Sequence, residues 1–204
     1  MVGGQQKSGG SWLPERFEVE RSVASGGMGV VYLARDRQTS ERVALKILHA
    51  GLEDDARFER EAIMLAALSH DAIVRYVAHG VSADKRPFIA MEWLEGEDLG
   101  KRLSRGPLTV GETVTLMGRV AEALAVVHRA GLVHRDIKPD NIFLPSGALG
   151  MAKIVDFGLA RPPRARMLTA DGMVVGTPGY MAPEQIRGET PDARVDVFAL
   201  GCVA

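Results

Sequence analysis

A short stretch of the chain combines side chains that phosphoryl transfer requires. It reads His134-Arg135-Asp136-Ile137-Lys138-Pro139-Asp140-Asn141, and Asp156-Phe157-Gly158 begins fifteen residues after Asn141. A protein that transfers a phosphoryl group must position the acceptor hydroxyl, neutralise charge and hold metal ions on the phosphates. Asp136 can orient a hydroxyl and accept its proton, and Lys138 can reach the transferred group. Asn141 and Asp156 offer hard oxygen ligands of the type that Mg²⁺ uses beside phosphate oxygens.

A solvated, charged loop is the alternative explanation of this stretch. Five fixed residues at these spacings would arise by chance in about one in ten thousand chains of this length, if all residue types were equally common. We therefore favour the catalytic interpretation.

A glycine cluster and a lysine form a second group of interest. Gly26-Gly27-Met28-Gly29 lies between two apolar runs, where free backbone N–H groups could hold phosphate oxygens, although an ordinary hairpin turn is the alternative. Lys46 stands at the centre of the alternating run Arg42–Leu48, and it is either buried with a partner or an edge lysine that reaches solvent. Glu61 lies on the apolar side of a predicted helix and is the available counter-charge for Lys46, with a surface glutamate as the alternative.

The elements that must position these groups are strands at first and helices later. Alternation of apolar and polar residues from Phe17 indicates a half-buried strand, whereas helical spacing begins at residue 53. Thr109 and Glu112 form a capping box that opens a long helix, which Gly131 ends. The predicted strands are 17–23, 30–33, 42–48, 73–77, 88–91, 132–133, 142–144 and 153–155, and the predicted helices are 53–68 and 109–130.

This order of elements predicts an α+β chain with two lobes. Residues 1–11 hold four glycines and two serines, so we expect a flexible leader. We expect the first lobe to span residues 12–91, a hinge to span 92–96 and the second lobe to span 97–204. The last residues, 195–204, are almost wholly apolar and predict a helix that is buried on most sides.

Composition restricts the class of protein. The 204 residues hold 25 Lys and Arg against 26 Asp and Glu, a formal net charge of -1, which argues against nucleic acid or anionic membrane as the main partner. The single cysteine, Cys202, excludes an intrachain disulfide, and we expect it to be a small buried hydrophobic residue. Since the chain has no apolar run long enough to span a bilayer and no signal-peptide core, we expect a cytoplasmic protein.

Together these motifs resemble a protein kinase of the eukaryotic-like (Hanks-type) serine/threonine type found in bacteria. The resemblance implies a two-lobed kinase fold, with an antiparallel sheet and one helix in the N-lobe and a mainly helical, here incomplete, C-lobe. It implies ATP-dependent transfer of the γ-phosphoryl group to serine or threonine hydroxyls of protein substrates, with ATP and Mg²⁺ as cofactors; a homodimer is compatible with it. The matching segments follow the family's order: Val23–Val31, Val43-Ala44-Leu45-Lys46, Glu61, Met91-Glu92-Trp93-Leu94, 134–141, Asp156-Phe157-Gly158 and Ala182-Pro183-Glu184.

The resemblance also implies a role for each site residue. Lys46 would pair with the α/β-phosphates and Glu61 would hold Lys46. Asp136 would be the catalytic base, assisted by Lys138, while Asn141 and Asp156 would bind Mg²⁺. The remaining implied nucleotide contacts come from the glycine loop, the sheet, the hinge and the floor of the site: Val23, Gly26, Gly27, Gly29, Val31, Ala44, Met91, Glu92, Leu94, Asp98 and Phe143.

The segment between Asp156 and Glu184 corresponds to the family's activation segment. It is basic and carries three hydroxyl side chains, Thr169, Thr177 and Tyr180. In the family the position of Thr177 lines the acceptor site, which leaves Thr169 as the expected phosphorylation site. A phosphate there could pair with Arg135 and order the segment; a solvated basic loop without a regulatory role is the alternative.

Two features depart from the family pattern. Ala24 stands where the first glycine of the phosphate loop is usual, and we expect a modest effect on nucleotide affinity. The chain ends at Ala204, inside a helix whose Asp196 matches the family's anchor of the catalytic loop, so we expect a truncated lobe with an exposed apolar patch. The alternatives to an active kinase are a catalytically impaired, nucleotide-binding or regulatory fragment and a fragment that barely folds.

Overall fold

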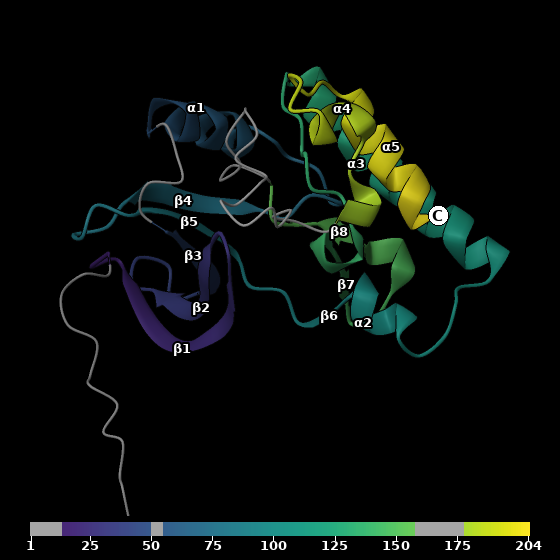
Figure 1. The fold of residues 1–204 in the computed structure, drawn as a ribbon. Coiled ribbons are helices and arrows are strands. Elements are labelled where there is room, and N and C mark those ends of the chain that lie inside the picture. The colour runs from purple at the N-terminus through teal and green to yellow at the C-terminus, as the bar shows by residue number, and fades with distance from the viewer. Residues whose placement is uncertain (1–13, 50–54, 158–177) are drawn as a thin grey trace, which may run out of the picture. The chain divides into compact units, whose positions relative to one another are not determined.

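A computed structural model describes residues 14–49, 55–157 and 178–204 of the chain. These residues form two compact units (Figure 1). The first unit holds residues 14–49 and 77–93, and the second holds 55–76, 94–157 and 178–204. Among the described residues, no helix combines the length and the apolar character that crossing a membrane requires.

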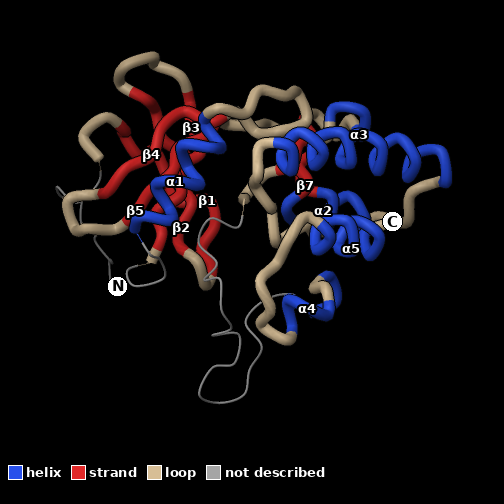
Figure 2. Tube along the Cα trace, turned by 90° about the horizontal axis from the view of Figure 1, so that it is seen from above, coloured by secondary structure: helices blue, strands red, loops and turns tan. Residues whose placement is uncertain are grey.

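A five-stranded sheet forms the first unit (strands β1 to β5 in Figure 2). β1 pairs with β2, β2 with β3 and β3 with β5 in antiparallel fashion, so the predicted antiparallel sheet is confirmed. The predicted strand 42–48 coincides with β3 because its residues alternate strictly. In spatial order the strands are β1 (Phe17–Gly26), β2 (Gly29–Asp36), β3 (Arg42–Leu48), β5 (Pro87–Glu92) and β4 (Tyr76–Val81).

The apolar core of this unit lies on one face of the sheet. Val43, Leu45 and Ile47 of β3 are almost fully buried, as the alternation predicts. They pack in one cluster with Phe17 and Phe88, whose rings meet edge to face at 5.9 Å between centroids. The face is therefore held together by apolar burial contributed by several strands.

The second unit combines helices with a small antiparallel sheet of order β6-β7-β8. Helices α3 and α5 of this unit are in contact (Figure 1). The elements are α1 (Asp55–Ala66), β6 (Gly96–Asp98), α2 (Leu99–Leu103), α3 (Val110–Arg129), β7 (Ile142–Pro145), β8 (Lys153–Ile154), α4 (Pro183–Ile186) and α5 (Arg194–Val203), with 3-10 turns at Pro139–Asn141, Leu149–Met151 and Pro178–Tyr180.

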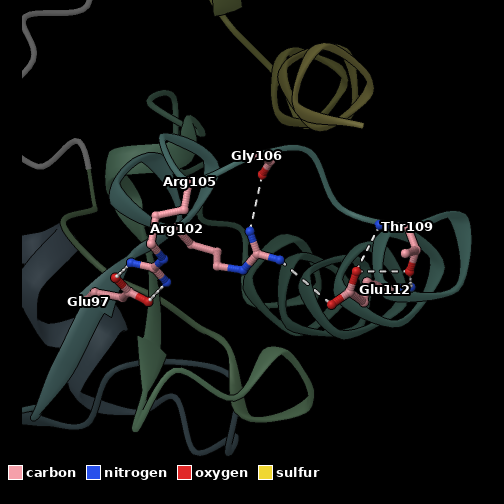
Figure 3. Close-up of polar contacts among 6 residues, drawn as sticks. All are labelled: Glu97, Arg102, Arg105, Gly106, Thr109 and Glu112. Atoms are coloured by element: carbon pink, nitrogen blue, oxygen red, sulfur yellow. Dashed lines mark hydrogen bonds and ion pairs between the residues drawn. The ribbon is translucent and has the colours of Figure 1, made fainter.

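The long helix α3 begins and ends as its sequence predicts. Thr109 Oγ1 accepts a hydrogen bond from the Glu112 N–H at 3.3 Å, and Glu112 Oε2 accepts one from the Thr109 N–H at 2.8 Å (Figure 3). At the other end Gly131 adopts a φ of +78°, which a side chain would strain. The predicted capping box and the glycine stop are both confirmed.

Two predicted strands are wrong. Ile73 and Val74 precede β4 and are buried in the second unit, where Ile73 forms an isolated bridge with Ile154 and the Val74 N–H donates to Ile154 O at 3.1 Å. Leu132 lies in no strand, because its N–H closes the end of α3 by donating to Val127 O at 3.1 Å. Short apolar runs indicate burial, but their periodicity does not distinguish a strand from a buried turn or loop.

Helix α5 buries one side only. Val195, Asp196 and Ala199 are buried, whereas Val197 and Phe198 are exposed to 62% and 43%. The expected exposed apolar patch is present on this helix. Cys202 is also exposed, so its predicted burial is wrong. It follows Val195 at i+7 on the same side of the helix, but the buried residues of α5 end at Ala199.

Candidate active site

The register of β7 and β8 brings the two predicted metal ligands to the same end of this strand pair. Ile142 pairs with Ile154, and the Val155 N–H donates to Asn141 O at 2.9 Å. Asn141 comes directly before β7, and Asp156 follows closely after β8. In an antiparallel pair these two ends are neighbours. Asp156 has a φ of +58°, an uncommon conformation for a residue other than glycine.

Asn141 holds Asp136 in place. Its Nδ2 donates to Asp136 O at 2.7 Å and to Asp136 Oδ2 at 3.0 Å. Asn141 is only 5% exposed. The Asn141 amide nitrogen donates to Asp136. The amide oxygen, which can only accept, is therefore the atom of this side chain that could coordinate a cation. Lys138 Nζ lies 3.4 Å from Asp136 Oδ2. The structure thus brings together Asp136, Lys138 and Asn141 as the sequence predicts.

The donors at this end of the strand pair fit a magnesium ion that phosphate and water oxygens also coordinate. Asn141 offers an amide oxygen and Asp156 a carboxylate, and Mg²⁺ in such sites takes only one or two protein carboxylates. Among the described residues, no cluster of three or more His, Cys, Asp or Glu side chains could hold a metal by itself.

His134 is a buried member of the loop 134–141, which we call the catalytic loop, and sequence reasoning missed its individual role. Its Nδ1 accepts from the Asp136 N–H at 3.3 Å, so its Nε2 carries the proton and donates to Val155 O at 3.0 Å. Its ring centroid lies 4.8 Å from that of Phe157. The neutral imidazole therefore connects the residue before Asp156 with the peptide N–H of Asp136.

Asp196 of α5 anchors the same loop through hydrogen bonds to its backbone. Asp196 is fully buried. Its carboxylate accepts from the N–H groups of His134 at 2.8 Å and Arg135 at 2.7 Å. His128 Nε2 of α3 donates to the same carboxylate at 2.8 Å. These bonds hold Arg135 at a φ of +67°. The expected anchor is confirmed, and His128 is a further partner.

Glu61 carries a pair of arginines that sequence reasoning did not anticipate. Arg57 Nε and Arg135 Nη1 each lie 3.0 Å from Glu61 Oε1, and all three side chains are less than one-fifth exposed. The Nη2 of Arg57 is buried without a hydrogen-bond partner among the described residues. Glu61 thus points away from water, as predicted. Its pairing with Lys46 joins residues of the two units and stays a prediction.

One face of the five-stranded sheet carries four of the residues expected to surround a nucleotide. Val31 pairs with Lys46, and Ala44 pairs with Met91. Residues that pair across strands, or that are two apart on one strand, share a face, so these four side chains lie on the face opposite the apolar cluster. Lys46 is only 6% exposed. The predicted alternative of an edge lysine reaching solvent is wrong, since β3 is an interior strand.

The glycine cluster forms the turn between β1 and β2. Gly26 pairs with Gly29, and the His49 N–H donates to Met28 O at 3.2 Å. A Cβ added to Gly29 would lie 2.2 Å from Ile47 O, whereas Gly26 and Gly27 have open space. Gly29 is therefore required for packing against β3, and the two others leave the backbone accessible. Val23 lies at an irregularity of β1.

The remaining predicted site residues lie in the second unit, in the predicted hinge segment 92–96 or outside the described residues. Asp98 pairs with Phe143 across β6 and β7. Asp98 Oδ1 accepts from the Lys101 N–H at 2.7 Å and so caps α2, a structural role that its sequence did not reveal. Glu92 ends β5, and Leu94 begins the next segment of the second unit. Thr169 and Thr177 lie outside the described residues.

Comparisons with known proteins agree with this geometry. Serine/threonine-protein kinase pkn2 of Myxococcus xanthus is 42% identical over 197 residues, which cover 93% of this chain and 24% of that protein. Serine/threonine-protein kinase PknB of Mycobacterium tuberculosis is 39% identical over 203 residues, which cover 95% of this chain and 32% of PknB. This chain therefore spans about a quarter to a third of the length of these curated relatives.

Solved structures show the same fold. The kinase domain of Mycobacterium tuberculosis PknI matches with a TM-score of 0.75 and 31% identity, over 95% of this chain and 74% of that one. A Rad53 structure in complex with AMP-PNP matches with a TM-score of 0.75 and 30% identity, over 93% and 47%. The predicted kinase fold is confirmed. Since a family model described as the protein kinase domain matches residues 17–204, the chain belongs to the protein kinase domain family.

Proposed function

We propose that this chain transfers the γ-phosphoryl group of ATP to serine or threonine hydroxyls of protein substrates. The observation that carries the proposal is the arrangement around Asp136, whose carboxylate is held by Asn141 at 3.0 Å and approached by Lys138 at 3.4 Å. The curated relatives are named serine/threonine-protein kinases, and this supports the acceptor class. The motif at Lys138, two residues after Asp136, is of the type found in serine/threonine-directed members.

In the proposed reaction Asp136 orients the acceptor hydroxyl and accepts its proton. The hydroxyl oxygen forms a bond to the γ-phosphorus while the bond from that phosphorus to the bridging oxygen of ADP breaks. Lys138 neutralises charge on the group in transfer. Because Asn141 donates to Asp136 Oδ2, the carboxylate keeps one orientation without reorganising during the reaction.

We assign the phosphates of the nucleotide to the glycine turn and Lys46, and its base to Val31, Ala44, Met91 and Phe143, with backbone contacts from Glu92 and Leu94. Asn141 and Asp156 would hold Mg²⁺, which supplies charge neutralisation on the phosphates when bound. The complex of Rad53 with AMP-PNP supports an ATP-like ligand. Glu61 would hold Lys46 in the nucleotide-bound protein.

Phosphate transfer from radiolabelled ATP in the presence of Mg²⁺ tests the proposal. We expect Asp136→Asn to lower kcat by about 10²- to 10⁴-fold, because the general base is lost. Asp140→Asn is the matched control: it makes the same chemical change at an exposed position of the same loop, and we expect its kcat to equal that of the wild type.

Two results would contradict the proposal. Undiminished transfer by Asp136→Asn would remove Asp136 as the base. A wild-type chain that binds ATP and Mg²⁺ in a thermal-shift assay but transfers no phosphate would favour the nucleotide-binding, regulatory alternative.

Autophosphorylation at Thr169 is a further part of the proposal. It is supported by the basic composition of the segment around Thr169 and by the guanidinium of Arg135, which already binds a carboxylate oxygen of Glu61 and could bind a phosphate in the same way. Mass spectrometry after incubation with ATP and Mg²⁺ tests it, and an active chain that remains unmodified at Thr169 would contradict it.

A further inference from the structure

We propose that Gln185 is a positioning residue for the catalytic loop, an inference that rests on the proposed phosphoryl transfer. Gln185 lies in the short helix α4 and is fifty residues away from the loop in sequence. Its Nε2 donates to Arg135 O at 3.0 Å, and its Oε1 accepts from the Ala182 N–H at 3.1 Å. The side chain thus connects the start of α4 to the residue directly before Asp136.

The partners of Gln185 determine which way its amide points. A backbone N–H can only donate, so the atom facing Ala182 must be the oxygen. A backbone carbonyl can only accept, so the atom facing Arg135 must be the nitrogen. The two bonds therefore require an amide in one orientation, and a side chain with only an acceptor would lose the bond to the loop.

The bond from Gln185 completes the fixation of one peptide plane. The peptide that joins Arg135 to Asp136 has its carbonyl held by Gln185 and its N–H held by His134 Nδ1 at 3.3 Å. On its other side the Arg135 N–H donates to Asp196. Arg135 has a φ of +67°, a conformation that persists in a residue other than glycine only when its surroundings constrain it.

Fixing this plane fixes the direction in which Asp136 leaves the backbone. Asp136 carries the proposed base, and small displacements of a reacting group lower the rate of reaction strongly. Gln185 contacts no reacting atom in this scheme. It acts through the backbone of Arg135, and it also couples the segment from Ala182 to Pro183 to the geometry of the catalytic loop.

A plain structural role as the helix cap of α4 is the competing explanation. The chain offers a matched case for it, because Glu112 of α3 also occupies the third helical position and also accepts from the N–H of the capping residue (Figure 3). Glu112 has no bond to the catalytic loop among its described contacts. Glu112→Ala therefore removes a cap and an ion pair with Arg102, and it removes no bond to the catalytic loop.

Two variants of Gln185 separate the roles. Gln185→Glu keeps an acceptor for the Ala182 N–H but replaces the donor that faces Arg135 O by an oxygen. Gln185→Ala removes both bonds. We expect both variants to lower kcat by about 10- to 100-fold while KM for ATP changes by less than about threefold, because the loop moves and the nucleotide contacts remain. We expect Glu112→Ala to keep the wild-type kcat.

Amide hydrogen exchange provides a readout that does not depend on activity. We expect faster exchange of the peptide covering residues 132–141 in both Gln185 variants, and wild-type exchange there in Glu112→Ala. If Gln185→Glu has the kcat of the wild type and the same amide exchange in residues 132–141, the inference is overturned. An inactive wild-type chain would contradict the proposed function, and the exchange experiment would still decide the role of Gln185.

Discussion

The core of the five-stranded sheet and the catalytic loop are stabilised in different ways. In the sheet, Leu45 and Ile47 are buried among other apolar side chains, including the aromatic ring of Phe88. At the catalytic loop, Asn141 and Asp196 of α5 are buried as well, but each makes hydrogen bonds to particular backbone or side-chain atoms. Apolar burial has no direction, whereas each of these hydrogen bonds does.

This difference decides how precisely each region is determined. A core tolerates exchange between apolar residues of similar volume, because burial is conserved. A buried carboxylate that accepts two N–H groups has no apolar substitute, because the donors would remain without partners. Lys46 is therefore held by a sheet that many apolar contacts stabilise. Asp136 is held by a few individual hydrogen bonds, and the loss of one of them changes the geometry of the loop only. The following predictions are ordered from the largest expected effect to the smallest.

Removal of the Asp196 carboxylate should have the largest effect. Asp196→Ala leaves His128 and the N–H groups of His134 and Arg135 without their acceptor in a buried place, and we expect a loss of about 3–5 kcal/mol in the free energy of unfolding. Urea denaturation measures this loss. Asp196→Asn keeps one carbonyl acceptor, so its free energy of unfolding should fall less. It provides a measurement even if the alanine variant does not fold.

Asp192→Ala is the control for this loss. Its side chain is 55% exposed next to Arg194 and accepts from the Arg194 N–H at 2.9 Å, at the start of the same helix. Its removal should therefore cost about 1 kcal/mol. Equal losses in the Asp196 and Asp192 variants would contradict the anchor role of Asp196.

Truncation in the sheet core should act on the whole unit and not on selected bonds. Leu45→Ala removes buried apolar surface and leaves a cavity, and we expect a loss of about 3 kcal/mol in the free energy of unfolding. Amide exchange in the loop 132–141 should remain as in the wild type under native conditions. Val81→Ala, at a position that is 60% exposed, is the control. Selective opening of the loop in Leu45→Ala would show that the two regions do not differ as described.

A single polar contact of the first unit provides the smallest test. The Arg16 guanidinium holds the pKa of the Asp36 carboxyl below its ordinary value of 3.8, through bonds of 3.0 and 2.6 Å, against the opposing effect of burial; the Gln38 N–H lowers it further. Because the folded pKa lies below the unfolded one, this stabilisation is present above pH 3.8 and is lost as pH falls through the folded pKa.

Asp36→Asn should lower the free energy of unfolding at pH 7 by about 2 kcal/mol. It should also make that free energy fall less between pH 5 and pH 2 than in the wild type, roughly the interval in which such carboxylates titrate. Urea denaturation at a series of pH values measures both. Glu18→Gln, in the largely exposed ion pair with Arg37, is the control. An unchanged acid dependence in Asp36→Asn would show that Asp36 does not contribute in this way.

Much of the site could be predicted because its signals are local in sequence. Asp136, Lys138 and Asn141 lie within six residues of one another, and the strict alternation of β3 places Ala44 and Lys46 on one face whatever else surrounds the strand. The capping box of α3 is likewise complete within four residues. Such patterns need no knowledge of distant parts of the chain.

Other contacts could not be predicted because they join residues far apart in sequence. Gln185 meets Arg135 fifty positions away, and Glu61 meets Arg135 over seventy-four. Sequence reasoning assigned Glu61 to a different partner, Lys46, since a carboxylate on an apolar face requires a cation without specifying which one. Arg57, one helical turn before Glu61, was a detectable signal, because residues at i and i+4 are neighbours on a helix.

By itself the sequence determined the chemistry available to this protein: which residues can accept a proton, bind a cation or hold a phosphate, and on which kind of element each lies. Only the tertiary structure decided which donors meet which acceptors. The physical reason is that a hydrogen bond requires the donor–acceptor distance to be correct to within a few tenths of an ångström, whereas a sequence pattern specifies only a face or an end of an element. The geometry of the catalytic loop, with Arg135 constrained by Asp196 and Gln185 from two helices, belongs to the tertiary structure.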